Sequence, residues 1–173
     1  MAMALCLSAC RKDVKLQTDA VQNRAAIPML RAHNVVTLIS DSGITRYHIE
    51  AAEWLVYDKA KPSYWEFPKG VHLQRYDDYL HPEAYLQADY AHYNEDEQIW
   101  RLRGNVYARN LQGEEFFTEE LYWNQKTERV YSDSTITIQR ATSTIRGIGF
   151  ESNQEMTKYT IKKPTGVIPV KED

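Results

Sequence analysis

Apolar and polar residues alternate along several stretches of this chain, most clearly at residues 100–109. In that stretch every second residue is apolar or small and the residues between are polar, which is the period of a β-strand with one buried face. Short polar segments typical of hairpin turns follow the alternating stretches at residues 94–97, 110–113 and 124–127. The pattern therefore predicts an antiparallel all-β structure with little helix.

A pattern of residue types recurs three times, at residues 52–58, 88–94 and 118–124. Each copy holds a small residue, then an acid, then an apolar residue three positions after the small one, and an aromatic residue two positions later. A turn and a second strand-like stretch follow each copy. Because repeats of this length mark units that bury their apolar faces only when stacked, we expect hairpins that stack and fold over on themselves.

The alternation gives the stacked hairpins one inner face, made of the apolar, aromatic or small residues at every second position. Its members are Leu55, Tyr57, Trp65, Phe67 and Val71 from the first unit, Ala91, Tyr93, Trp100, Leu102 and Val106 from the second, and Leu121, Trp123, Ile136 and Ile138 from the third. Gly104 interrupts this face, and a residue without a Cβ allows a bulge or a close backbone approach there. We expect most of these side chains to form a core, and the pattern leaves open which of them would line a groove.

Composition agrees with this interpretation and excludes several classes of protein. The chain has 173 residues, which fits one domain, and its twelve tyrosines and four tryptophans favour strands. A formal net charge of −3 gives no reason to expect a nucleic-acid partner. Both cysteines, Cys6 and Cys10, lie in the first ten residues, so a disulfide framework or a cysteine metal cluster in the body of the protein is excluded.

The first ten residues predict a membrane anchor. Residues 7–10 read Leu-Ser-Ala-Cys, which matches a lipobox, where a bacterial signal peptide is cut and its cysteine is acylated. We expect lipidation of Cys10 and a periplasmic protein anchored as a lipoprotein; the alternative is a cytosolic protein with a chance match. The expected organisation is a signal remnant at 1–10, a polar tether at 11–34, one domain at 35–160 and a loosely held tail at 161–173.

No group of residues predicts catalysis or metal binding. The five histidines have no metal-ligand spacing with one another or with carboxylates. Neighbouring acids such as Glu119 and Glu120 would point to opposite faces of a strand, so they could not converge on one bond. Arg101, Arg103 and Arg109 are expected on the outer face, where Glu119 or Glu120 could pair with them. We therefore expect neither an enzyme nor a cofactor.

Five segments of the chain carry a resemblance to a known family: residues 40–47 (SDSGITRY), 65–68 (WEFP), 100–106 (WRLRGNV), 131–133 (YSD) and 149–156 (GFESNQEM). In this order, over about residues 35–160, they resemble the LptC proteins. LptC is the periplasmic component of the lipopolysaccharide export transporter. The last segment is the most specific, whereas the Gly-Asn-Val pattern is shared with the wider OstA-like superfamily.

The resemblance implies a twisted, folded-over antiparallel β-jelly-roll, open along one edge, whose apolar interior holds lipid acyl chains. It implies that the protein receives lipopolysaccharide from an inner-membrane ABC transporter of the LptB, LptF and LptG type. The lipid would then pass to an LptA-like periplasmic protein by pairing of strand edges. The familiar members are anchored by an N-terminal membrane helix, whereas this chain is expected to use Cys10 at the inner membrane.

A second interpretation comes from a different class of protein. The stacked hairpins could form a closed scaffold lipoprotein that binds a protein or a polysaccharide through surface tyrosines such as Tyr76, Tyr79 and Tyr85. The carrier predicts an open apolar cleft, and the scaffold predicts a filled interior with an exposed aromatic patch.

Overall fold

Eleven strands form one antiparallel sheet in the computed structural model, which describes residues 24–166. Within these residues, the 3-10 turn Arg24–Ala26 precedes the first strand. The all-β prediction is confirmed. The strands are β1 (Leu30–Asp41), β2 (Ile44–Tyr57), β3 (Tyr64–Phe67), β4 (Val71–Tyr76), β5 (Pro82–Ala88), β6 (Tyr90–Asn94), β7 (Ile99–Arg109), β8 (Glu115–Asn124), β9 (Arg129–Gln139), β10 (Thr144–Asn153) and β11 (Tyr159–Pro164).

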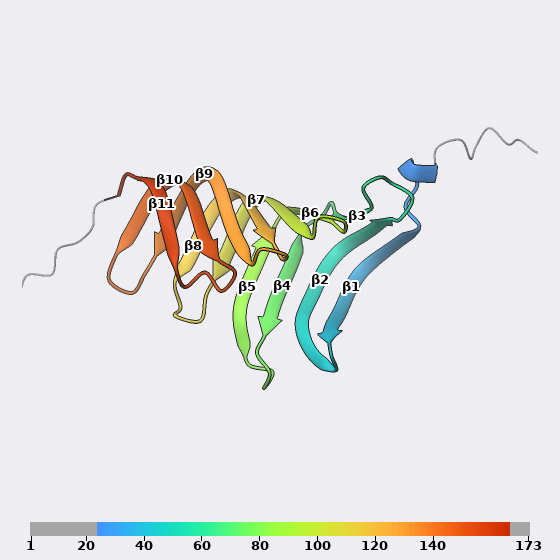
Figure 1. Cartoon of the computed structure of the whole chain (residues 1–173), viewed down its shortest axis with the longest axis horizontal. Helices are drawn as coiled ribbons and strands as arrows, with labels where there is room; N and C mark the ends of the chain where they lie inside the picture. The colour runs from blue at the N-terminus through green and yellow to red at the C-terminus, as the bar shows by residue number, and fades with distance from the viewer. Residues whose placement is uncertain (1–23, 167–173) are drawn as a thin grey trace, which may run out of the picture.

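The strands follow one another in chain order along the molecule, from β1 at the right of Figure 1 to β11 at the left. β3 and β4 lie end to end along one edge of β2, and β5 and β6 lie end to end along one edge of β7. If each of these pairs is counted as one interrupted strand, the sheet is a simple meander. Within the described residues, β1 pairs only with β2 and β11 only with β10, so each leaves one edge free.

Most of the long strands are interrupted near their middle, and the interruptions form one line across the sheet, which we call the crease. Shifts of register between β7, β8, β9 and β10 fall at this line. The bulge expected at Gly104 is confirmed, and a Cβ at this position would lie 3.0 Å from Oδ2 of Asp89. The backbone takes a positive φ at the crease in Asn34 (51°), Gly70 (89°), Gly104 (73°) and Gly149 (78°).

The sheet folds over along the crease, so that two halves face each other. One half contains β4 and β5 with the adjoining parts of the long strands, and we call it the β4–β5 half; the other contains β3 and β6 and is the β3–β6 half. Aromatic rings meet between them, since Tyr47 and Trp123 have centroids 5.7 Å apart, as do Phe116 and Phe150. The buried apolar core lies in this space. The predicted antiparallel β-jelly-roll is thereby confirmed.

The strands extend beyond the expected domain at both ends. β1 begins at Leu30, inside the expected tether, because Leu30 and Ala32 pair with apolar residues of β2. β11 continues to Pro164, inside the expected tail, and pairs with β10. The lipobox, Cys10 and most of the expected tether lie outside the described residues. Between residues 24 and 166, no helix has the length and apolar character needed to cross a membrane.

Candidate functional site

The inner face of the folded sheet gathers most of the residues that alternation assigned to it. Twelve of the fourteen predicted side chains belong to the core cluster or pack against it, and Leu55 and Tyr57 do not. Trp65 and Tyr93 are partly buried, and the other ten are buried. The sequence thus predicted which side chains meet in the interior along β3, β4, β6, β7, β8 and β9.

Leu55 and Tyr57 lie on the face of β2 opposite to Trp54, which corrects the prediction for β2, although the side chain of Leu55 is itself buried. Leu55 pairs with Glu66, whose neighbour Trp65 belongs to the interior. Tyr57 stacks on Tyr64, with ring centroids 4.5 Å apart. Strict alternation fails here because β2 crosses the crease after Ala51, and the inward-facing positions change phase there.

Trp54 occupies the inner position that sequence analysis gave to Leu55. It packs against Phe67 and Trp65, with ring centroids 5.8 Å and 5.0 Å away. Ala51, rather than Ala52, is the structural counterpart of Ala88, since both are buried and both pair with Val71 near the crease. The residue after Ala51 is Ala52 rather than an acid, so the recurring pattern at residues 52–58 lies one position out of phase with the fold.

Aromatic rings dominate the interior of the β3–β6 half. Tyr93 packs against both Trp65 and Trp100, with centroid distances of 5.1 Å and 4.8 Å, and Phe67 stacks on Trp100 at 5.6 Å. Rings at these separations gain attraction beyond the burial of their area. A dry aromatic surface of this kind suits contact with hydrocarbon.

Among the described residues, two small cavities lie between the halves. The larger has a volume of about 140 Å³ and is lined by residues of both halves, including Tyr47, Trp65, Trp100 and Trp123. The smaller, of about 40 Å³, is lined mainly by apolar side chains and lies beside Met156. Pockets that hold a drug-sized ligand usually measure about 300–1,000 Å³. The interior is therefore largely filled in this structure.

The two halves also meet opposite the crease, along a line of hairpin turns that we call the seam. The turn between β10 and β11 crosses this line and inserts Met156 into the core. Arg75 of β4 holds the turn through Glu155, with Nη1 and Oε1 3.3 Å apart. The side-chain amide of Asn110 donates to the carbonyl oxygen of Met156 at 2.9 Å.

The seam is closed by polar contacts at one end only. At that end Tyr159 donates to Glu114 at 3.1 Å and accepts from Nε of Arg140 at 3.0 Å. Within residues 24–166, every hydrogen bond or ion pair that crosses the seam involves the β10–β11 turn or Tyr159. The larger cavity lies beyond this polar end, between β1 and β2 on one side and β3 and β6 on the other.

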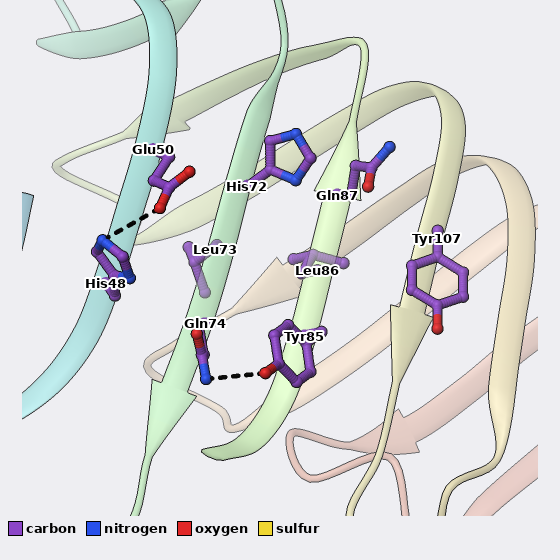
Figure 2. A pocket seen from close by; sticks show the side chains of 9 residues that line it. All are labelled: His48, Glu50, His72, Leu73, Gln74, Tyr85, Leu86, Gln87 and Tyr107. Atoms are coloured by element: carbon purple, nitrogen blue, oxygen red, sulfur yellow. Dashed lines mark hydrogen bonds and ion pairs between the residues drawn. The ribbon is translucent and has the colours of Figure 1, made fainter. Parts of the chain in front are cut away.

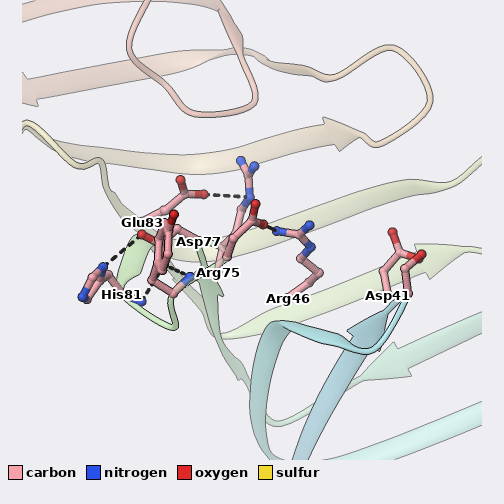
Figure 3. Close-up of polar contacts among 9 residues, drawn as sticks. Asp41, Arg46, Arg75, Asp77, His81 and Glu83 are labelled. Atoms are coloured by element: carbon pink, nitrogen blue, oxygen red, sulfur yellow. Dashed lines mark hydrogen bonds and ion pairs between the residues drawn. The ribbon is translucent and has the colours of Figure 1, made fainter.

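A network of charged groups fixes the β4–β5 turn at the seam (Figure 3). Oδ1 of Asp77 accepts hydrogen bonds from the backbone N–H groups of Tyr79 and His81, both at 2.8 Å. Burial would raise the pKa of Asp77, but these donors outweigh it and hold the pKa below its usual value. Arg46 of β2 binds Asp78 of the same turn. The turn is therefore tied to the neighbouring strand.

The outer surface of the β4–β5 half has a different character. A hollow of about 200 Å³ lies there. Figure 2 shows four of the side chains that line it, His48, Glu50, Gln74 and Tyr85. His48 lies 3.5 Å from Glu50, and Gln74 donates to Tyr85 at 3.1 Å. Among the described residues, no group of three or more potential ligands could hold a metal ion. A surface of hydrogen-bonded polar side chains is not a favourable binding surface for hydrocarbon chains.

On the outer face of the β3–β6 half, arginines pair with acids across strands as expected. Arg101 lies 2.8 Å from the carboxylate of Glu120, and Arg103 lies 3.7 Å from it.

A family model now adds to this geometry. The model described as "Lipopolysaccharide-assembly, LptC-related" matches residues 1–166. The chain belongs to the LptC family. Membership assigns it to lipopolysaccharide transport in the periplasm, and the folded-over jelly roll with an apolar interior agrees with that assignment. No curated protein matches the chain.

Proposed function

We propose that this LptC-family protein carries lipopolysaccharide through the periplasm with the lipid acyl chains held between the two halves of the sheet. The observation that carries the proposal is the family match, together with an inner face that is apolar across β2 to β10. Acyl chains that cross an aqueous compartment need a dry surface, because exposure of apolar area to water is unfavourable. Carriage breaks no covalent bond, so it requires neither a catalytic group nor a cofactor.

The chains would enter where the seam has no polar closure. The cavity of about 140 Å³ lies there, bounded by Ile39 and Tyr47 on one side and by Trp65 and Tyr93 on the other. Its volume is too small for several chains, so the halves must move apart as lipid enters. At this end, such a movement breaks only apolar contacts. At the other end, the polar contacts of Arg75, Asn110 and Tyr159 hold the halves together.

The free edges of the sheet would join the protein to its partners. Unpaired strand edges present rows of N–H and C=O groups that can continue a sheet into another protein. β1 and β11 lie at opposite ends of the meander, so a transporter of the LptB, LptF and LptG type and an LptA-like protein could dock without competing. Lipidation of Cys10 would hold the domain at the inner membrane.

A closed scaffold is the second candidate, and the filled interior favours it. Tyr79 is 81% exposed and Tyr85 is 45% exposed, as a surface that binds a protein or a polysaccharide would require. The two functions differ in whether lipid reaches the inner face.

Site-specific photocrosslinking in cells tests the carrier directly. A photoreactive residue is placed in turn at Tyr93, Trp100 and Trp123, with Arg101 and Arg103 on the outer face as matched controls. We expect lipopolysaccharide adducts from the inner positions only. Adducts from none of the positions in a folded, abundant protein would contradict the proposal and leave the scaffold as the better account.

A further inference from the structure

Met156 in the β10–β11 turn combines burial with an unusual backbone conformation. Seven non-glycine residues between positions 24 and 166 have a positive φ, and that of Met156 is 55°. The other six are exposed, whereas only 6% of the surface of Met156 is exposed. Non-glycine residues seldom take this left-handed conformation, and such strain persists only where the surrounding contacts impose it. The turn therefore places an apolar side chain in the core by means of a strained backbone.

The polar contacts that impose this conformation lie around the turn. The side-chain amide of Asn110 donates to the carbonyl oxygen of Met156 at 2.9 Å, and the N–H group of Met156 donates to the carbonyl oxygen of Asn153 at 3.0 Å. Arg75 lies 3.3 Å from Glu155. The contacts of Asn110 and Arg75 join the turn to the facing half of the sheet. Because water can replace hydrogen bonds and ion pairs of this kind, the turn can leave the core at a modest net cost.

Met156 lies at the end of the apolar space between the two halves. It lines the cavity of about 40 Å³ together with Leu73 and Trp123, and both of these residues also line the cavity of about 140 Å³. Leu86 and Leu121 add further apolar wall to the smaller cavity. The two cavities are therefore neighbours. An acyl chain that enters the larger cavity and extends toward the polar end of the seam would meet the side chain of Met156.

We propose that Met156 is a displaceable plug: its side chain occupies the subsite for the end of an acyl chain, and the β10–β11 turn moves out of the core when lipid fills the interior. The inference rests on the proposed carriage of acyl lipid and says how the far end of the interior opens. Methionine is unbranched and apolar, as a short piece of alkyl chain is, so the same walls suit either. Once displaced, the backbone of Met156 can leave the left-handed region, which offsets part of the cost of opening.

Methyl NMR of the full-length protein, with a nitroxide dissolved in the water, tests the movement. Methionine, isoleucine and leucine methyl groups are labelled with ¹³C, and the methionine signals are assigned with Met29→Leu and Met156→Leu. We expect the nitroxide to leave the Met156 signal sharp in the lipid-free protein and to broaden it once purified lipopolysaccharide is added. Met29 is the internal control, because it is 65% exposed and should be broadened without lipid.

The outcomes separate the plug from carriage itself. If lipopolysaccharide shifts the inner methyl signals of Ile49 and Leu102 while Met156 stays protected from the nitroxide, the plug is wrong and carriage stands. If saturating lipopolysaccharide shifts no inner methyl signal, both proposals are wrong.

Two substitutions at Met156 give a second test. Alanine and leucine both keep a Cβ in the same backbone conformation, but only alanine removes the plug. We expect Met156→Ala to bind lipopolysaccharide about 10-fold more tightly than wild type, because the lipid no longer has to displace a buried methionine, and Met156→Leu to bind as wild type does. Ile138→Ala is the control for general loosening of the core, since Ile138 is fully buried and lines neither cavity. Unchanged or weaker binding by Met156→Ala, or an equal gain in Ile138→Ala, would overturn the proposal.

Discussion

Glu53 joins three segments of the chain at the crease. Its carboxylate lies 2.9 Å from Nζ of Lys69, which precedes β4, and 3.7 Å from Nε of Arg31 in β1. The hydrogen bond from Lys69 lowers the pKa of Glu53 below its usual value, and the nearby charge of Arg31 acts in the same direction. The ionised form of Glu53 is therefore favoured in the folded protein.

The lowered pKa of Glu53 predicts a loss of stability in acid. A group whose pKa is lower in the folded state contributes stability above its unfolded pKa of about 4.3, and this contribution disappears as the pH falls through the folded pKa. We expect Glu53→Gln to lower the free energy of unfolding at pH 7 and to reduce its dependence on pH below about 4.5. Denaturant unfolding at several pH values measures both effects.

Glu119→Gln is the matched control, because Glu119 lies at the crease in β8, is exposed and makes no ion pair within the described residues. An identical pH dependence for wild type and Glu53→Gln would contradict this role of Glu53.

At the scale of the strand, the crease depends on residues that accept a positive φ and a close neighbour. Both conditions hold at Gly104: its φ is 73°, and Asp89 lies against the position that a Cβ would occupy. Gly43 has a φ of 84° but nothing within 4 Å of its Cβ position. The two glycines therefore separate backbone strain from steric crowding.

We predict that Gly104→Ala destabilises the protein more than Gly43→Ala does. Each alanine incurs roughly 1–2 kcal/mol of left-handed backbone strain, and only the one at position 104 must also displace Asp89. Thermal or denaturant unfolding of the two variants measures the difference. Equal losses of stability in the two variants would mean that the close approach between Gly104 and Asp89 adds nothing to the cost of the alanine.

The β10–β11 turn closes one end of the seam, and Arg75 is the charged residue that holds it. Its guanidinium lies 3.3 Å from both Glu83 and Glu155. We predict that Arg75→Ala accelerates amide hydrogen exchange at residues 153–158, because the turn opens more often once this tie is lost. Arg129→Ala is the control, since Arg129 pairs with Glu151 within one half. Unchanged exchange in the Arg75 variant would show that apolar contacts alone hold the turn.

Sequence patterns predicted the strands and turns well because both depend on local periodicity. They misplaced Leu55 and Tyr57 because the change of phase in β2 arises from folding of the whole sheet. Asn34, Gly70 and Gly149 mark the crease only after the strands are aligned in space. The seam was not predictable either, since Arg75 and Glu155 are 80 residues apart and no period relates them.

For the whole molecule, the two free edges differ in length and in protection. β1 spans twelve residues, and Val36 and Leu38 are 69% and 61% exposed beside its free edge. β11 spans six residues and ends in Lys162, Lys163 and Pro164, which discourage unspecific pairing. The open end of the seam lies beside β1 and β2, so one end of the molecule combines a long free edge with the proposed entry for lipid.

The central claim is that acyl chains lie between the two halves of the sheet, and paramagnetic NMR tests it most directly. Lipopolysaccharide with a nitroxide on one acyl chain is added to the methyl-labelled protein. We expect broadening of the inner methyl groups of Ile49, Leu102 and Ile136, which are buried, and little effect on the exposed methyl groups of Val36 and Ile148. Broadening confined to the exposed methyl groups, or none at saturating lipid, would contradict the account.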